Sequence, residues 1–185
     1  MMPEISLNVL DVTENSVSAG ATRIGISVTV DSPADTLTIV ISDNGCGMSE
    51  ETVRRVIDPF YTTRKTRKVG LGVPFFKLAA ELSGGRFEID SKEGEGTVVT
   101  AVFGLTNIDR MPLGDMPSTI HTLVTMHEAI DFCYTFRYDE EEFTLDTAEM
   151  REVLGGISFA EPEVSAYLRE YLTENTAEVT RGRIL

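Results

Sequence analysis

Hydrophobic and polar positions in the first part of the chain follow helical and strand periods in turn. Over residues 4–19 apolar side chains recur at helical spacing, which predicts an opening helix that ends at Gly20. Alternation at every second position predicts strands over 24–30 and 37–42. Turn-forming residues fill positions 31–35, so we expect these two strands to form a hairpin.

The same reading continues to residue 103. Ser49 followed by two glutamates is typical of a helix start, and Pro59 predicts the end of that helix. A further helix is expected over 73–82, followed by strands over 86–91 and 97–103. Helices and strands are therefore interleaved throughout this part of the chain.

The pattern changes after residue 103. Residues 107–117 contain two prolines and a glycine, which predict a connecting loop. The elements expected after it are a helix over 119–129, a strand over 130–138, a turn over 139–142, a return strand over 143–145, and helices over 147–154 and 163–174. We therefore place a boundary near residue 106, between a first unit of residues 1–106 and an acidic α+β extension of residues 107–185.

The strongest strand pattern lies in this extension. Its apolar positions are Phe132, Tyr134, Phe136 and Tyr138, which alternate with polar residues. Such a strand is most simply a hydrophobic face that covers a small core. A surface for a protein partner, or for a second copy in a homodimer, is the alternative.

Charge adds a constraint on partners. The 185 residues carry 30 Asp and Glu against 16 Lys and Arg, a net charge of −14. Residues 1–103 hold 14 acidic and 10 basic residues, whereas residues 104–185 hold 16 and 6. A nucleic-acid-binding surface needs clustered Lys and Arg, so we expect no nucleic-acid partner. The acidic extension indicates either a well-solvated surface or a face for a basic protein.

Location follows from what the sequence lacks. No run approaches the roughly 18 to 20 apolar residues that a membrane span needs, and the first residues do not resemble a secretory signal. Cys46 and Cys133 lie far apart and form no metal-binding spacing. We therefore expect a cytoplasmic protein with reduced thiols and no membrane partner.

Candidate chemistry begins on the opening helix. Asp11 and Asn15 are four residues apart, so both side chains leave the same face of the predicted helix. A carboxylate and an amide oxygen on one face can hold Mg²⁺ and orient a water molecule. Such pairs also occur on helices by chance, so this pair becomes informative only together with other motifs.

A glycine-containing turn follows the second predicted strand. It reads Asp43-Asn44-Gly45-Cys46-Gly47-Met48. An Asp at a strand end can accept a hydrogen bond from an adenine amino group, and glycines beside it let the backbone approach the base. A tight turn explains the two glycines equally well.

A basic, glycine-containing stretch occupies residues 58–72. It begins with Asp58-Pro59-Phe60, continues through the basic cluster Arg64, Lys65, Arg67 and Lys68, and ends with Gly70-Leu71-Gly72. Glycines directly before a helix leave its first amide groups free to face phosphate oxygens. The basic side chains place positive charge beside those phosphates, although a solvated basic loop is the alternative.

Taken in order, these stretches resemble the sequence boxes of one superfamily. Residues 11–15, 43–47, 58–60, 70–72 and the turn 94–97 resemble the N, G1, F, G2 and G3 boxes of the GHKL superfamily of gyrase, chaperone ATPases, histidine kinases and MutL. The resemblance covers about residues 4–103. It implies an α+β fold, the Bergerat-type ATP-binding sandwich with helices packed on one face of a mixed sheet, followed here by the small α+β extension.

The resemblance also implies roles for single residues. Asn15 would coordinate Mg²⁺, Asp43 would recognise adenine, and Thr97 would support the adenine pocket. The residues assigned to ATP are Asn15, Asp43, Gly45, Gly47, Met48, Phe60, Thr62, Thr63, Arg64, Lys65, Lys68, Gly70, Leu71, Gly72 and Thr97. Asp11 stands where hydrolysing members carry a longer Glu, which predicts slow turnover, and Glu14 is the neighbour that would compensate.

Two branches of the superfamily are resembled. Residues 14–22 resemble MutL, whereas residues 58–64 resemble the catalytic domain of bacterial histidine kinases, and the longer shared feature favours the kinase branch. His121 and His127 both follow the ATPase region and lack the expected phosphoacceptor motif, and three residues precede the first helix. We therefore expect a slow ATPase or a protein kinase that uses Mg-ATP and acts in trans. A nucleotide-gated, non-enzymatic module of anti-sigma or MutL type that acts through residues 107–185 is the alternative.

Overall fold

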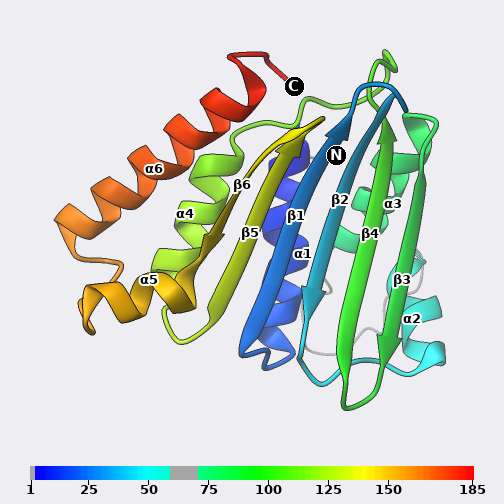
Figure 1. The fold of residues 1–185 in the computed structure, drawn as a ribbon. Helices are drawn as coiled ribbons and strands as arrows, with labels where there is room; N and C mark the ends of the chain where they lie inside the picture. The colour runs from blue at the N-terminus through cyan, green and yellow to red at the C-terminus, as the bar shows by residue number, and fades with distance from the viewer. Residues whose placement is uncertain (1–2, 59–70) are drawn as a thin grey trace.

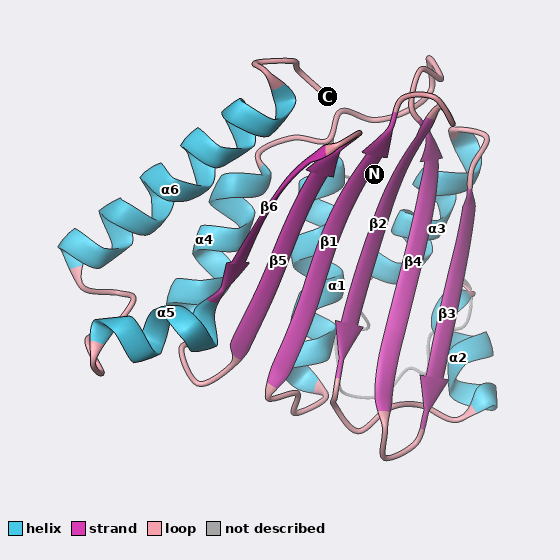
Figure 2. Cartoon of the chain, viewed as in Figure 1, coloured by secondary structure: helices cyan, strands magenta, loops and turns pink. Residues whose placement is uncertain are grey.

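The computed structural model describes residues 3–58 and 71–185, which form one mixed sheet with helices packed against it (Figures 1 and 2). The strands are β1 (Arg23–Asp31), β2 (Thr36–Asp43), β3 (Arg86–Lys92), β4 (Gly96–Gly104), β5 (Asp131–Tyr138) and β6 (Glu141–Asp146). The helices are α1 (Ile5–Ser18), α2 (Glu50–Ile57), α3 (Gly72–Leu82), α4 (Met116–Met126), α5 (Thr147–Leu154) and α6 (Pro162–Thr180). This α+β architecture confirms the fold class expected from the sequence.

The sheet order is β3-β4-β2-β1-β5-β6. Neighbouring strands are antiparallel except for β1 and β5, which are parallel. Helices α1, α3 and α4 cover one face of the sheet, while α5 and α6 lie at its β6 edge (Figure 1). The predicted hairpin is confirmed, since β1 and β2 pair from Ile24 opposite Asp43 to Asp31 opposite Thr36.

Alternation along the strands decides which face is covered. On β1, Ile24, Ile26 and Val28 are buried under the helices, whereas Ser27 and Thr29 face the other side and stay half-buried. The period of two therefore separates an apolar inner face from a polar outer face. As a result, a side chain in register with these apolar residues at a strand end points toward the helix layer.

The segment after residue 106 continues the same sheet. Strand β5 pairs with β1 over its whole length, from Arg23 opposite Asp131 to Val30 opposite Tyr138. Its aromatic residues join the buried cluster formed by β1, β2 and the helices. The expectation of a small core under this strand is therefore corrected: because β5 lies beside β1, its apolar face is continuous with the core of residues 1–106.

Two helices of the extension differ in their bounds from their predictions. Helix α4 begins three residues earlier than expected, because the Asp115 carboxylate caps it by accepting from the backbone N–H of Ser118 at 2.9 Å, and Pro117 occupies the first turn. Helix α6 continues six residues beyond the predicted end, and its buried stripe continues with Val179. The return strand likewise begins at Glu141 rather than at Phe143.

One buried side chain of β5 carries an unsatisfied polar atom. Tyr134 is 1 % exposed, and its hydroxyl has no hydrogen-bond partner among residues 3–58 and 71–185. Burial raises the pKa of Tyr134 far above its usual value. A buried hydroxyl without a partner costs about 1–3 kcal/mol. We therefore expect Tyr134→Phe to raise the free energy of unfolding by about 1 kcal/mol, measured by urea denaturation.

Tyr138→Phe provides the matched control on the same strand. The Tyr138 hydroxyl accepts a hydrogen bond from Ser32 at 3.4 Å, so its removal should bring no gain in stability. A Tyr134→Phe protein less stable than the parent would contradict the prediction.

In the described part of the chain, no helix has the length and apolar character that a membrane span requires.

Candidate functional site

A cavity of about 620 Å³ lies where β2 ends and β4 begins, between α1, α2 and α3. This is the lower end of the sheet in Figure 1. Its walls are formed by Val12, Asn15, Ser16, Ser18, Ala19, Asp43, Cys46, Gly47, Met48, Val56, Val73, Ile89, Thr97 and Val99. The cavity is therefore largely apolar with a few polar groups, which is the usual character of a small-molecule site.

Asp43 is the acidic side chain in the cavity wall. It is the last residue of β2 and shares the inner face with Ile39 and Ile41, so its carboxylate points into the helix layer. The Ser16 hydroxyl donates to Oδ2 at 2.5 Å, and the Gly45 backbone N–H donates to Oδ1 at 2.8 Å. Both oxygens are thus held in place, while lone pairs remain free to accept from a ligand.

The glycine turn after Asp43 packs against the turn between β3 and β4. Gly47 has φ +64°, and a Cβ at this position would lie 1.9 Å from the Lys92 carbonyl oxygen. The Gly94 backbone N–H donates to the Cys46 carbonyl oxygen at 2.8 Å. A Cβ on Gly45 would lie 2.9 Å from the Ala19 Cβ. The close approach that these glycines permit is therefore between protein segments, and it shapes one end of the cavity.

Hydroxyl groups lie beside Asp43. Thr97 is opposite Asp43 in the β2–β4 register, so both side chains face the helix layer. The Thr97 hydroxyl is 2.8 Å from the Ser91 hydroxyl, which accepts from the Met48 backbone N–H at 2.9 Å. Ser91 was not predicted as a site residue, because a hydroxyl near the end of a strand carries no motif of its own.

Helix α1 brings Asn15 to the cavity and Asp11 to the start of α3. Asn15 is exposed and forms part of the wall. Asp11, one turn earlier, lies against the first residue of α3, where a Cβ on Gly72 would be 2.0 Å from Asp11 Oδ2. A carboxylate next to a helix N-terminus is stabilised by the helix dipole. The sequence motifs around Asn15, Asp43, Gly72 and Thr97 therefore converge in space.

Comparison with known proteins fixes the family. Residues 3–107 match the family described as histidine kinase-, DNA gyrase B- and HSP90-like ATPases. The chain belongs to this family. The expected GHKL resemblance is confirmed, because this match covers all five boxes.

Curated relatives of this ATPase domain are sensor proteins of bacteria. A putative sensor protein of Shewanella frigidimarina is 33 % identical over 102 residues, which are 54 % of this chain and 16 % of that protein. A probable C4-dicarboxylate sensor kinase of Bacillus subtilis is 35 % identical over 78 residues, which are 42 % of this chain and 15 % of that protein. The matches thus span about a sixth of these relatives, and they support the histidine-kinase-like branch.

The fold of the ATPase domain is also found in a solved structure. The N-terminal domain of a DNA repair protein superimposes with a TM-score of 0.56 and 16 % sequence identity. The superposition covers 96 % of this chain and 57 % of that one, so it includes the extension. It shows a shared fold.

The resemblance to this family implies magnesium, which the described residues would hold only together with a nucleotide. The described residues contain no group of three or more His, Cys, Asp or Glu that could hold a metal by themselves. Mg²⁺ is commonly bound by one or two protein oxygens together with substrate phosphates and water. The exposed amide of Asn15 at the cavity can supply such an oxygen.

Glu14 lies on a different side of α1 from the cavity. Its Oε1 is 2.7 Å from Nε2 of His127, which directly follows the last residue of α4. It does not form part of the cavity wall. His127 thereby links the extension to the helix that carries Asn15, a contact across 113 positions that no local pattern indicates.

The remaining assigned residues divide into two groups. Leu71 is exposed and stands directly before Gly72, the first residue of α3, without a side-chain capping hydrogen bond. The other assigned residues lie outside the described residues: Phe60, Thr62, Thr63, Arg64, Lys65, Lys68 and Gly70.

Besides Ser91, the sequence reasoning missed Ser16, whose hydroxyl holds Asp43. It also missed the apolar walls, because residues such as Val73 and Ile89 have the pattern of ordinary core positions.

Proposed function

We propose that this protein binds Mg-ATP in the cavity between α1, β2 and β4 and turns it over slowly. The observation that carries the proposal is Asp43, whose carboxylate is held by the Ser16 hydroxyl and the Gly45 backbone N–H while it faces the cavity. A fixed acceptor in a largely apolar cavity suits an adenine base, which offers an amino donor and two flat apolar faces. Val73 and Ile89 line the same cavity and would face such a base.

The phosphates would extend toward α3. The first amide groups of α3 begin at Gly72, beside Asp11, and helix N-termini favour phosphate oxygens. Bound Mg²⁺ would neutralise phosphate charge, and Asn15 would hold it together with those oxygens and water. The basic residues before Gly70 would supply further positive charge. Base recognition is thus assigned to the cavity around Asp43, and phosphate binding to the start of α3 beside it.

Asp11 is the proposed base for the attacking water. Its carboxylate is at the start of α3, where the terminal phosphate would lie. We expect Asp11→Asn to lower the rate of ATP hydrolysis by about 100-fold, since general-base action contributes about 10² to 10⁴. The affinity for ATP should be equal or higher, because one negative charge near the phosphates is removed. Phosphate release and calorimetry on the same protein measure the two quantities.

Two further variants complete this test. Glu88→Gln changes an exposed carboxylate on the outer face of β3 and should leave hydrolysis unchanged. Glu14→Gln examines the alternative base, and we expect a small effect because Glu14 is hydrogen-bonded to His127. If Glu14→Gln removes hydrolysis and Asp11→Asn does not, the base is Glu14.

Two reactions would give slow turnover. The protein is either an ATPase that releases phosphate, or a cytoplasmic protein kinase that transfers phosphate to a partner protein bound by residues 107–185. The second candidate is a nucleotide-gated switch without catalysis. It is favoured by the placement of Asp11, which packs on α3 and is not part of the cavity wall. Incubating the full chain with γ-labelled ATP and cell extract separates these functions. A labelled protein band indicates a kinase, free phosphate alone indicates an ATPase, and tight binding without either indicates a switch.

A further inference from the structure

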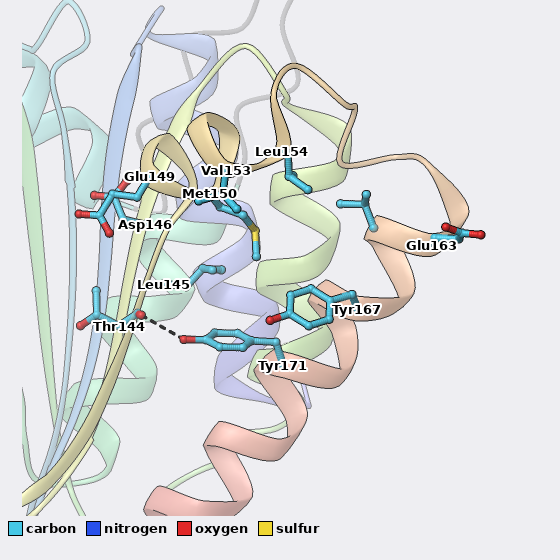
Figure 3. Close-up of a pocket in the computed structure, with 11 residues that line it drawn as sticks. Thr144, Leu145, Asp146, Glu149, Met150, Val153, Leu154, Glu163, Tyr167 and Tyr171 are labelled. Carbon is cyan, nitrogen blue, oxygen red and sulfur yellow. Dashed lines mark hydrogen bonds between the residues drawn. The ribbon is translucent and has the colours of Figure 1, made fainter.

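A second hollow lies at the β6 edge of the sheet, between α5 and α6 (Figure 3). Its volume is about 480 Å³. One wall is the α6 stripe of Glu163, Tyr167 and Tyr171, which are each one helical turn apart. The other wall includes Met150 and Val153 of α5. We call this hollow the α5–α6 groove.

The centre of the α5–α6 groove is apolar and open. Val153 is 87 % exposed and Tyr167 is 57 % exposed, and they stand on facing helices. Leu145 of β6 forms the buried floor between them. Apolar side chains that gather around one groove mark an interaction site more often than single exposed residues do. A ligand that covered them would remove this apolar area from water.

Carboxylates stand at both ends of the α5–α6 groove. Asp146 and Glu149 lie at one end and Glu163 at the other (Figure 3). Asp146 is paired with Arg23 at 2.8 Å, whereas Glu149 and Glu163 form no ion pair with any residue in 3–58 or 71–185. Within residues 3–58 and 71–185, no Lys or Arg lines the groove. Its charge therefore suits an apolar ligand with basic groups at both ends.

The form of the ligand follows from the covered strand edge. β6 is the last strand of the sheet, and an exposed edge can bind an extended peptide as an added strand. Here the Tyr171 ring stands over that edge, with its hydroxyl directed at the Thr144 carbonyl oxygen at 3.5 Å (Figure 3). Addition of a strand would displace this ring. A helix that lays apolar side chains between α5 and α6 would not.

We propose that the α5–α6 groove binds an amphipathic helix of a partner protein, with apolar residues at its centre and Lys or Arg at both ends. The apolar centre supplies affinity and the two acidic ends set orientation and specificity. The groove is separate from the nucleotide cavity, and no residue in the described part of the chain lines both. This binding does not depend on ATP.

The probe is a synthetic helical peptide of about 14 residues, with Leu at positions i, i+3, i+4 and i+7 and Lys at both ends. Fluorescence anisotropy measures its affinity for the full chain. We expect Val153→Asp to weaken binding by about tenfold or more, since a charge enters the apolar centre. Ile108→Asp is the matched control, because Ile108 is 96 % exposed, lies outside the groove and receives the same charge. It should leave the affinity unchanged.

A second comparison tests the acidic ends. Joint replacement of Glu149 and Glu163 by Gln should weaken binding and reduce its salt dependence, whereas Glu93→Gln in the β3–β4 turn should not. ATP affinity, measured on the same variants, reports whether they are folded. If the parent protein does not bind ATP, that result counts against the nucleotide proposal alone. Three results would overturn the helix-binding proposal. They are equal losses of peptide affinity in Val153→Asp and Ile108→Asp, equal binding of a Glu-ended peptide, or a dimer that Val153→Asp converts to a monomer.

Discussion

Asp43→Asn is expected to weaken Mg-ATP binding by about 10- to 100-fold. The carboxylate accepts from Ser16 and Gly45 and would accept a third bond from the adenine amino group. An asparagine has the same shape but places a neutral acceptor, or an amide donor, at that position. Hydrogen bonds to charged groups contribute about 1.5–3 kcal/mol, and 1.4 kcal/mol corresponds to a tenfold change in affinity. Calorimetry of the full chain with Mg-ATP measures the change.

Asp90→Asn is the control for this variant. Asp90 is an exposed residue of β3 on the outer face of the sheet, and the same loss of charge there should not alter ATP affinity. Urea denaturation of both variants separates lost recognition from lost stability. An Asp43→Asn protein that is folded and binds ATP as tightly as the parent would show that the carboxylate does not read the base.

Gly47→Ala is expected to lower the free energy of unfolding by about 3 kcal/mol. Two costs add at this position: the left-handed backbone at φ +64° costs an alanine about 1–2 kcal/mol, and overpacking costs about 1–3 kcal/mol. The second cost arises because the new Cβ would lie 1.9 Å from the Lys92 carbonyl oxygen, which is backbone and cannot rotate away. Urea denaturation measures the loss.

Gly94→Ala isolates the first of these two costs. Gly94 has a similar backbone, with φ +79°, but a Cβ there would meet no atom within 4 Å. We therefore expect Gly94→Ala to cost about 1–2 kcal/mol, less than Gly47→Ala. Equal losses in the two variants would mean that the loop after β2 moves freely and does not hold the wall of the cavity.

Local patterns were sufficient to place several of the residues that line the candidate cavity. Asp43 could be placed at a strand end because the alternation of Ile39 and Ile41 fixes its side of the sheet. Asp11 and Asn15 could be placed on one helix face because helical spacing is regular. Where the chemistry rests on a single strand end or helix face, the sequence therefore determines both the residue and its direction.

Contacts between distant segments could not be predicted in this way. The parallel pairing of β5 with β1 joins residues more than 100 positions apart, and no motif in either strand identifies the strand with which it pairs. The Glu14–His127 hydrogen bond likewise joins two helices that are far apart in the sequence, and it depends on how α1 and α4 pack together. These partners become visible when the sheet order is known.

One adenine nucleotide is expected to bind between α1, β2 and β4. Backbone amide NMR of the ¹⁵N-labelled full chain, titrated with ADP in the presence of magnesium, follows this binding residue by residue. We expect saturable shifts that centre on Asn15, on Asp43 to Met48 and on Thr97. An unchanged spectrum at millimolar ADP, or shifts confined to the α5–α6 groove, would contradict this expectation.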